Sequence, residues 1–154
     1  MDQGPVADPC GLASSGRAGP GPLELCFGDM SDSVANDSPA AHVARAYVAA
    51  LNAGNRDAIV GLFDDDAEWL GQLAAPHRGR EALAELYEKL LGHVSGASDL
   101  RIGGQVTEGD ASIIVIERRD RATGAWKVVA LDHLELNEQG QISRISIYGP
   151  PRIE

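Results

Sequence analysis

The chain has 154 residues, of which 44% are apolar and 23% charged, as expected for one ordinary globular domain. Its formal net charge of -10 opposes binding to nucleic acid and to anionic membranes, because like charges repel over long range. No apolar run approaches the roughly 20 residues of a membrane-spanning helix. The first residues also lack the basic-then-apolar pattern of a secretory signal, so we expect a cytoplasmic protein.

Residues 1–37 are rich in Gly, Pro, Ser and Asp and show no periodicity, so they predict a disordered tail before a folded domain at 38–154. Met30 inside this tail suits a second start of translation. Both cysteines, Cys10 and Cys26, belong to the tail as well. We therefore expect no disulfide, zinc–thiolate site or cysteine nucleophile in the folded part.

Three helices are predicted, with one short strand among them. Ser38 and Pro39 form a helix start, and Gly54 provides the stop of a helix that carries Tyr47 on its apolar stripe. Asn55 begins a second, shorter helix whose stripe includes Phe63 and which the aspartates at 64–66 end. Residues 67–71 suit a short strand, 73–79 a loop, and 80–91 a third helix with Tyr87 on its apolar face.

Strand patterns follow the third helix. The predicted strands are 98–107 (broken at Gly103–Gly104), 111–120, 125–137 and 142–149, joined by turns at 108–110, 121–124 and 138–141. The order α-α-β-α-β-β-β-β predicts an α+β fold, in which helices pack on a mainly antiparallel sheet.

Two segments carry a family resemblance: LNAGNRDAIVGLFDDDAEW at 51–69 and HRGREALAELYEKL at 77–90. They resemble the SnoaL-like and ketosteroid-isomerase-like branch of the NTF2-like superfamily. The resemblance implies a curved sheet that three helices close into a cone, with an apolar pocket inside. It also implies a homodimer formed through the outer face of the sheet. Since this fold carries many activities, it does not by itself identify one.

The isomerase branch implies roles for several positions. Tyr47 takes the place of the tyrosine that donates a hydrogen bond to the developing enolate, and Tyr87 that of the tyrosine beside it. Phe63 replaces a third tyrosine of that network. Gly71 takes the place of the general base, and Val129 that of a second acid. This branch therefore implies an isomerase that retains an oxyanion donor and lacks the usual base.

The limonene-epoxide-hydrolase branch implies an alternative site. Arg118 and Asp120 match its Arg-x-Asp spacing on the long central strand, but Ile147 replaces its second aspartate. An ion pair beside the turn at 121–124 explains the same two charges without any catalysis.

The inner face of the strand at 125–137 stays open at this stage. The resemblance places Val129, Leu131 and His133 toward the cavity, whereas hydropathy alone equally favours the alternate set that contains Asp132. An inward His133 could act as a base near neutral pH. The histidines show no spacing typical of a metal site.

Together these patterns predict a pocket for a small lipophilic molecule, with neither metal nor cofactor. The expected apolar lining is Val43, Leu62, Trp69, Leu70, Leu86, Leu90, Ile114, Ile116, Leu131, Ile145 and Ile147. We hypothesise either an isomerase that uses Tyr47, with Tyr87 and Asp120 as further catalytic candidates, or a non-catalytic ligand-binding or dimerisation module. The candidate ligand contacts are Trp69, Arg118, His133, Phe63, Ile145 and Ile147.

Overall fold

A computed structural model of the chain describes residues 37–72, 74–93 and 99–149. The three helices are α2 (Pro39–Ala53), α3 (Arg56–Val60) and α4 (Arg80–His93). The six strands are β1 (Phe63–Gly71), β2 (His77–Arg78), β3 (Leu100–Glu108), β4 (Ala111–Arg119), β5 (Trp126–Leu136) and β6 (Ile142–Tyr148). The predicted tail, with both cysteines and Met30, lies outside the described residues apart from Asp37. None of the described helices is long and apolar enough to cross a membrane.

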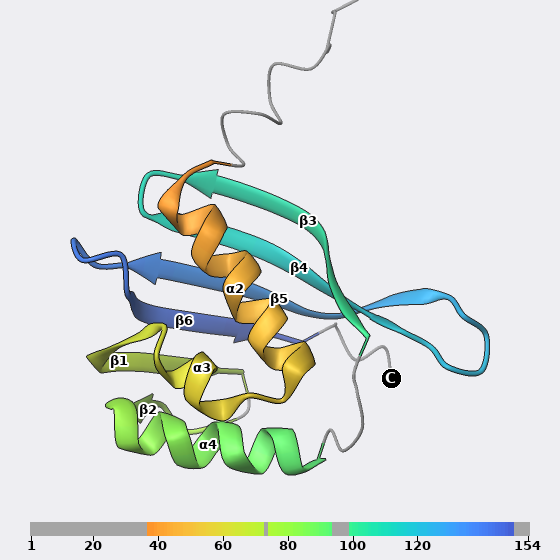
Figure 1. The fold of residues 1–154 in the computed structure, drawn as a ribbon, viewed down its shortest axis with the longest axis horizontal. Coiled ribbons are helices and arrows are strands. Elements are labelled where there is room, and N and C mark those ends of the chain that lie inside the picture. The colour runs from red at the N-terminus through yellow and green to blue at the C-terminus, as the bar shows by residue number, and fades with distance from the viewer. Residues whose placement is uncertain (1–36, 73, 94–98, 150–154) are drawn as a thin grey trace, which may run out of the picture.

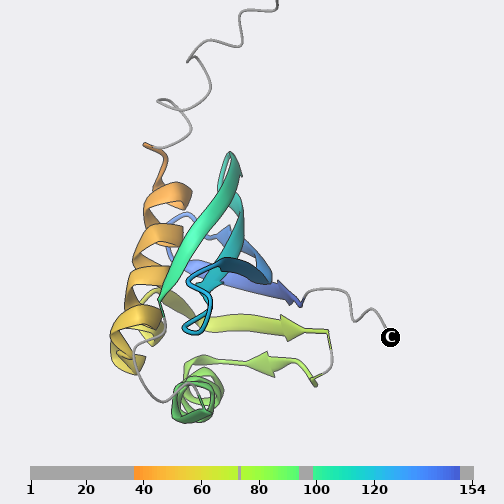
Figure 2. The same ribbon diagram turned by 90° about the vertical axis from the view of Figure 1, so that its right-hand side faces the viewer.

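The six strands form one curved sheet in the order β2-β1-β6-β5-β4-β3. Every neighbouring pair is antiparallel except β1 and β6, which run parallel. Figure 1 shows α2 crossing one face of the sheet, with α4 beside β2. The quarter-turn in Figure 2 shows the sheet bending toward α2. This arrangement confirms the α+β prediction.

The ends of the first helix follow from its capping residues. The Ser38 side chain accepts a hydrogen bond from the Ala41 amide at 3.1 Å, and Pro39 occupies the first turn, where its missing N–H costs nothing. Gly54 ends the helix with φ 62, a left-handed conformation that glycine adopts without strain. Several small residues of α2, among them Ala40, Ala41 and Ala44, are fully buried, so the helix lies close against the sheet.

The second helix is shorter than predicted. It ends at Val60, and Phe63 opens β1. The aspartates at 64–66 are part of that strand and do not stop the helix. An exposed strand tolerates these acids because they point away from the core, as their exposure shows for Asp65 and Asp66. The segment predicted as a loop at 73–79 contains β2, which pairs with Glu68 and Trp69.

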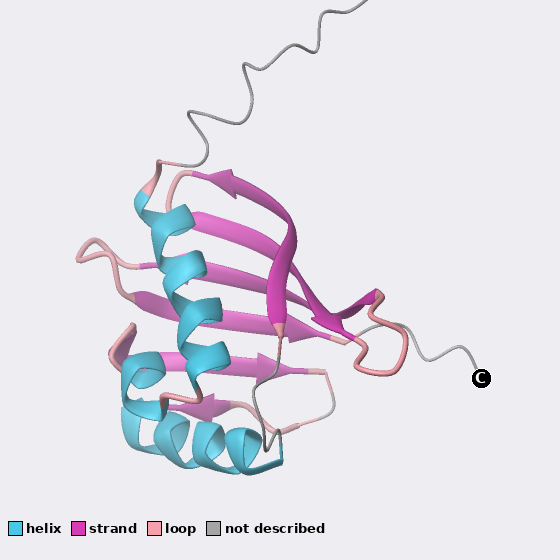
Figure 3. Ribbon diagram, turned by 45° about the vertical axis from the view of Figure 1, so that its right-hand side comes forward, coloured by secondary structure: helices cyan, strands magenta, loops and turns pink. Residues whose placement is uncertain are grey.

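Two irregularities shift the sheet register. The β3–β4 pairing shifts between Ile102 and Gly104, and the β4–β5 pairing shifts between Ile116 and Glu117. A β-carbon on Gly103 would lie 2.4 Å from the Glu117 side chain, so a larger residue there would displace the Glu117 carboxylate. The predicted break at 103–104 is thus a bulge within a continuous strand. Figure 3 shows the strands curving strongly in this region.

Candidate functional site

Two tyrosines meet in the centre of the core. The hydroxyls of Tyr47 on α2 and Tyr87 on α4 lie 3.0 Å apart, and both side chains are almost completely buried. Phe63 packs against them, with ring centroids 6.5 Å from Tyr47 and 5.9 Å from Tyr87. The structure thus brings together three residues that the sequence analysis selected. Burial raises the pKa of both phenols, so both remain protonated over the physiological range.

Asp132 is the carboxylic acid of this site. Its side chain on β5 is 1% exposed, and across the sheet its nearest neighbours are Ile114 on β4 and Ile147 on β6. Burial raises its pKa from the ordinary value to about 7, while hydrogen bonding by the Tyr47 hydroxyl acts in the opposite direction. One carboxyl oxygen, Oδ1, is buried and has no hydrogen-bond partner. A carboxyl group that titrates near neutral pH therefore adjoins the tyrosine pair.

The inward position of Asp132 corrects the orientation taken from the family. His133 pairs with Ile113 and Ser146 and is only partly buried, so it is not on the inner face beside Asp132. Leu131, which was expected in the lining, pairs with the exposed Tyr148. Of the two sets left open, the one with Asp132 and Leu134 is on the inner face, where both residues are buried.

The set predicted from hydropathy is wrong only at the start of β5. Val128 is 49% exposed, whereas Val129 packs against the core. The register shift at Ile116 and Glu117 reverses the side-chain alternation there, because one extra residue moves every later side chain to the opposite face.

Trp69 closes the site on the side of β1. Its ring is 7% exposed and stands edge-on to His77, with centroids 5.6 Å apart. Trp69 and Gly71 are two residues apart on one strand and so share a face. A β-carbon on Gly71 would lie 2.4 Å from the indole. The Trp69 ring therefore occupies the space beside Gly71, the position that the resemblance assigns to the base.

The indole N–H of Trp69 is a second unsatisfied polar group. Nε1 is close enough to Tyr87 to lower the pKa of that phenol, yet it has no partner at hydrogen-bonding geometry and is buried. Buried polar groups in proteins are normally paired. Trp69 Nε1 and Asp132 Oδ1 are thus two buried polar atoms that form no hydrogen bond with the described residues.

The Arg-x-Asp motif does not contribute to this site. Asp120 lies in the exposed β4–β5 turn, where it accepts a hydrogen bond from Lys127 at 2.6 Å and from the Ala122 and Thr123 amides. The Lys127 hydrogen bond is the largest cause that lowers the pKa of Asp120 to about 2. Arg118 is exposed as well. The structure therefore places Asp120 and Arg118 outside the buried tyrosine cluster, and the partner of Asp120 is a lysine.

Most of the other residues predicted to line the pocket lie inside the protein. Ile145 is fully buried and Ile147 partly buried against the core. Leu90 is 39% exposed, so its placement in the lining was wrong. Within the described ranges, no group of three or more His, Cys, Asp or Glu side chains could hold a metal ion.

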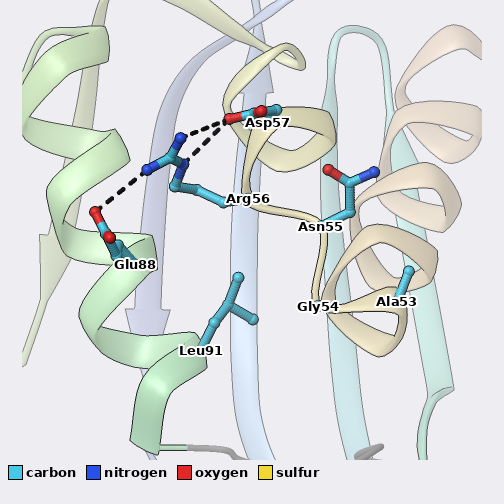
Figure 4. A pocket seen from close by; sticks show the side chains of 7 residues that line it. All are labelled: Ala53, Gly54, Asn55, Arg56, Asp57, Glu88 and Leu91. Atoms are coloured by element: carbon cyan, nitrogen blue, oxygen red, sulfur yellow. Dashed lines mark hydrogen bonds and ion pairs between the residues drawn. The ribbon is translucent and has the colours of Figure 1, made fainter.

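A surface hollow between α3 and α4 has a different character (Figure 4). Arg56 bridges Asp57 at 3.0 Å and Glu88 at 3.2 Å, and all three side chains are well exposed. Such exposed ion pairs contribute little and are common on protein surfaces. The buried cluster of Tyr47, Tyr87, Asp132 and Trp69 is therefore the better candidate site.

Comparison with known proteins agrees with this architecture. Residues 44–145 match the family model of the SnoaL-like domain. A SnoaL-like protein of unknown function from Burkholderia thailandensis is similar in structure, with a TM-score of 0.61 and 17% identity over 75% of this chain and 98% of its own. An NTF2-like protein of unknown function from Cytophaga hutchinsonii gives a TM-score of 0.56 and 17% identity over 75% of this chain and 92% of its own. At such identities the likeness shows the fold alone, and no curated protein matches the sequence. The chain belongs to the SnoaL-like domain family.

Proposed function

We propose that the cluster of Tyr47, Tyr87 and Asp132 binds a small lipophilic molecule through a carbonyl oxygen and catalyses an isomerisation by proton transfer. The observation that carries the proposal is the buried, unpaired Oδ1 of Asp132 beside the Tyr47 hydroxyl. An acid whose pKa is close to the working pH serves equally well as proton acceptor and proton donor.

The proposed reaction shifts a carbon–carbon double bond relative to a carbonyl group. The Asp132 carboxylate removes a proton from the carbon between the carbonyl and the double bond. The Tyr47 hydroxyl donates a hydrogen bond to the enolate oxygen that develops, and Tyr87 holds Tyr47 in place through the 3.0 Å contact between their hydroxyls. The protonated Asp132 then returns the proton to the far carbon of the former double bond, which completes the isomerisation without a net change in composition.

An assay with a β,γ-unsaturated cyclic ketone tests this proposal, because the conjugated product absorbs in the ultraviolet. We expect Asp132→Asn to lower kcat by about 100-fold or more and Tyr47→Phe by about 10- to 1,000-fold. Asp120→Asn is the matched control and should leave the rate unchanged, since this aspartate pairs with Lys127 in the β4–β5 turn. In the wild type, kcat/KM should rise with pH and reach half its maximum near the Asp132 pKa of about 7. Equal rates in all three variants and the wild type would refute the mechanism.

A non-catalytic binding module is the second candidate, and the near-complete burial of Tyr47, Tyr87 and Asp132 favours it. A thermal-shift screen of lipophilic ketones distinguishes the two candidates. A module binds a ketone in a way that depends on Tyr47 but shows no turnover of the unsaturated ketone. If a ketone causes the same thermal shift in Tyr47→Phe as in the wild type, this tyrosine is not part of the binding site.

A further inference from the structure

The end of the β4–β5 hairpin (residues 117–127) is basic, although the chain as a whole is strongly acidic. These residues include four of the 13 Lys and Arg residues and only two acids, whereas the formal net charge of the chain is -10. Figure 1 shows the turn of this hairpin projecting beyond the ends of α2 and β6, and Figure 3 shows the same projection. The basic side chains are therefore displayed away from the body of the domain.

The two acids of the hairpin end already have basic partners. Glu117 accepts a hydrogen bond from Nε of Arg101 at 2.7 Å, and Asp120 accepts one from Lys127 at 2.6 Å. Among the described residues, the guanidinium group of Arg119 has neither an ion-pair nor a hydrogen-bond partner. The hairpin end thus retains positive charge that its own acids do not neutralise.

Arg118 adds to this charge without stabilising the sheet. It lies directly opposite Lys127 in the β4–β5 pairing, and like charges in such a pair destabilise two strands. Lys127 bonds to Asp120 instead, so Arg118 has no counter-ion among the described residues. The fold gains nothing from this arrangement, whereas an anionic partner would stabilise it.

Arg101 on β3 is held in one orientation beside the hairpin end. Its Nε donates to Glu117, and its guanidinium carbon lies 4.2 Å from the centre of the Trp126 ring. Its two terminal nitrogens have no partner among the described residues, and half of the side chain is exposed. An arginine that is already held in place loses little freedom when it binds an anion. Its terminal N–H groups match the two oxygens of a carboxylate.

Arg119 adjoins the same indole. Arg119 and Trp126 are direct partners in the β4–β5 pairing, so their side chains share a face. A β-carbon on Gly124 would lie 4.0 Å from a terminal nitrogen of Arg119, so this guanidinium group lies beside the turn. Two guanidinium groups, one held and one unpaired, therefore adjoin one partly buried indole ring.

We propose that the hairpin end, together with Arg101, binds an acidic peptide segment of a partner protein, with one carboxylate at Arg101, a second at Arg119 and the peptide chain across Trp126. A projecting hairpin does not enclose its ligand, so it suits a polypeptide better than a small molecule. A nucleic acid or an anionic membrane extends beyond the hairpin and would meet the acidic remainder of the chain, which repels it. This surface does not involve Tyr47 or Asp132.

Fluorescence anisotropy with two labelled eight-residue peptides tests the proposal. One peptide alternates Glu and Ser, so that its carboxylates share one face of an extended chain, and the matched peptide alternates Gln and Ser. The wild type should bind the Glu peptide at least about 10-fold more tightly than the Gln peptide, as expected for hydrogen bonds to charged groups. Added salt should weaken the binding of the Glu peptide.

Three variants assign this binding to the hairpin end. Arg119→Gln removes one exposed, unpaired charge and should weaken binding of the Glu peptide by about 3- to 10-fold. Arg101→Lys keeps the charge but lacks the paired N–H groups, and it should weaken binding by a similar factor. Arg78→Gln is the matched control with unchanged affinity, because Arg78 is an exposed arginine on β2 at the opposite edge of the sheet.

Nuclear magnetic resonance of the unaltered protein locates the bound peptide. The chain has two tryptophans, so two indole N–H signals are expected, and the Trp126→Phe variant identifies that of Trp126. The Glu peptide should move this signal. The signal of Trp69, which is only 7% exposed and lies on β1, should stay in place.

Several results would overturn the proposal. These are affinities for the Glu and Gln peptides that do not differ, the absence of binding by either peptide, an equal loss of affinity in Arg78→Gln and Arg119→Gln, and an unmoved Trp126 signal. Single-stranded RNA and vesicles that contain phosphatidylserine serve as competitors. Tighter binding of either competitor than of the Glu peptide would also overturn the assignment to a peptide partner.

Discussion

Asp132 combines two properties that rarely coincide in a purely structural residue. It is 1% exposed among aliphatic neighbours, and one of its oxygens has no partner. A buried carboxylate without full hydrogen bonding destabilises the folded state, since the charged form loses its hydration. Proteins often tolerate such a cost at functional sites, where perturbed pKa values concentrate.

This cost should be visible as a pH dependence of stability. The pKa of Asp132 is about 7 in the folded protein and, in the unfolded chain, about 3.9. Between these values the folded state binds the extra proton, so this group's contribution to the free energy of unfolding falls as pH rises from about 4 to 7 and is constant above. Relative to the wild type, Asp132→Asn should gain stability across that window, by a few kcal/mol at most. Urea unfolding at a series of pH values measures the difference, and parallel curves for the two proteins would show that Asp132 titrates normally.

The contact between Gly71 and the indole gives a second prediction at this scale. Gly71→Ala adds a β-carbon that would lie 2.4 Å from Trp69, so the buried ring must move. We expect a loss of about 1–3 kcal/mol in the free energy of unfolding, as in other overpacked interiors. Tryptophan fluorescence should change as well. Gly92→Ala is the control, because a β-carbon there meets nothing within 4 Å. If Gly71→Ala changes neither the free energy of unfolding nor the fluorescence, the Trp69 ring can move aside without cost.

At the scale of the elements, the two ends of the first helix were predicted better than the inner face of β5. Ser38 and Gly54 bound the first helix as expected, because capping is a local property of one or two residues. The orientation of Val128 depends on a bulge at Ile116 and Glu117, which is a property of two paired strands. The sequence of one strand alone does not contain that information.

The candidate site was predicted in part for the same reason. Tyr47 and Tyr87 lie on clear apolar helix stripes, and in the core they meet Phe63, which was predicted on a helix but is the first residue of β1. Asp132 could have been identified as the one acid in an alternating row with Leu134 and Leu136, all three of which are buried. The family positions pointed to the opposite alternation instead. Lys127 as the partner of Asp120 could not be foreseen, since it depends on how the hairpin folds back.

The Asn52 side chain joins helix α2 to the edge strand β3. The Asn52 amide donates to the Leu100 carbonyl at 2.9 Å and accepts from the Leu100 amide at 2.8 Å. Asn52→Ala removes both bonds, and we expect a loss of about 1–3 kcal/mol in the free energy of unfolding. Hydrogen exchange should accelerate at the start of β3 and less in β6. Uniform acceleration over the sheet would show that Asn52 stabilises the fold as a whole.

At the scale of the whole molecule, the three described helices leave the other face of the sheet uncovered. On the opposite face, Val106 is 70%, Ile113 39% and Tyr148 45% exposed. Val106 and Ile113 are direct cross-strand partners, so their side chains form a continuous apolar surface. Exposed apolar surfaces of this kind commonly mark an interface. We expect a second copy of the chain to cover this face.

The oligomeric state of one variant tests that expectation. Ile113→Lys places a charge in the apolar surface and should convert a dimer into a monomer, as measured by sedimentation velocity. Val128→Lys is the matched control, because Val128 is also exposed, at 49%, and is near the β4–β5 turn. A wild-type protein that sediments as a monomer at high concentration would contradict the expectation.

The parallel pairing of β1 with β6 has a consequence for synthesis. Phe63 in β1 aligns with Ile142 in β6, so the ribosome makes almost the whole domain before the partner of β1 exists. Until then, β1 has only the two residues of β2 to pair with, and the indole of Trp69 lacks its neighbouring strand. Contacts between such distant segments form late and slowly. The apolar side chains of β1 therefore stay uncovered on the side of β6 until the final strand has been made.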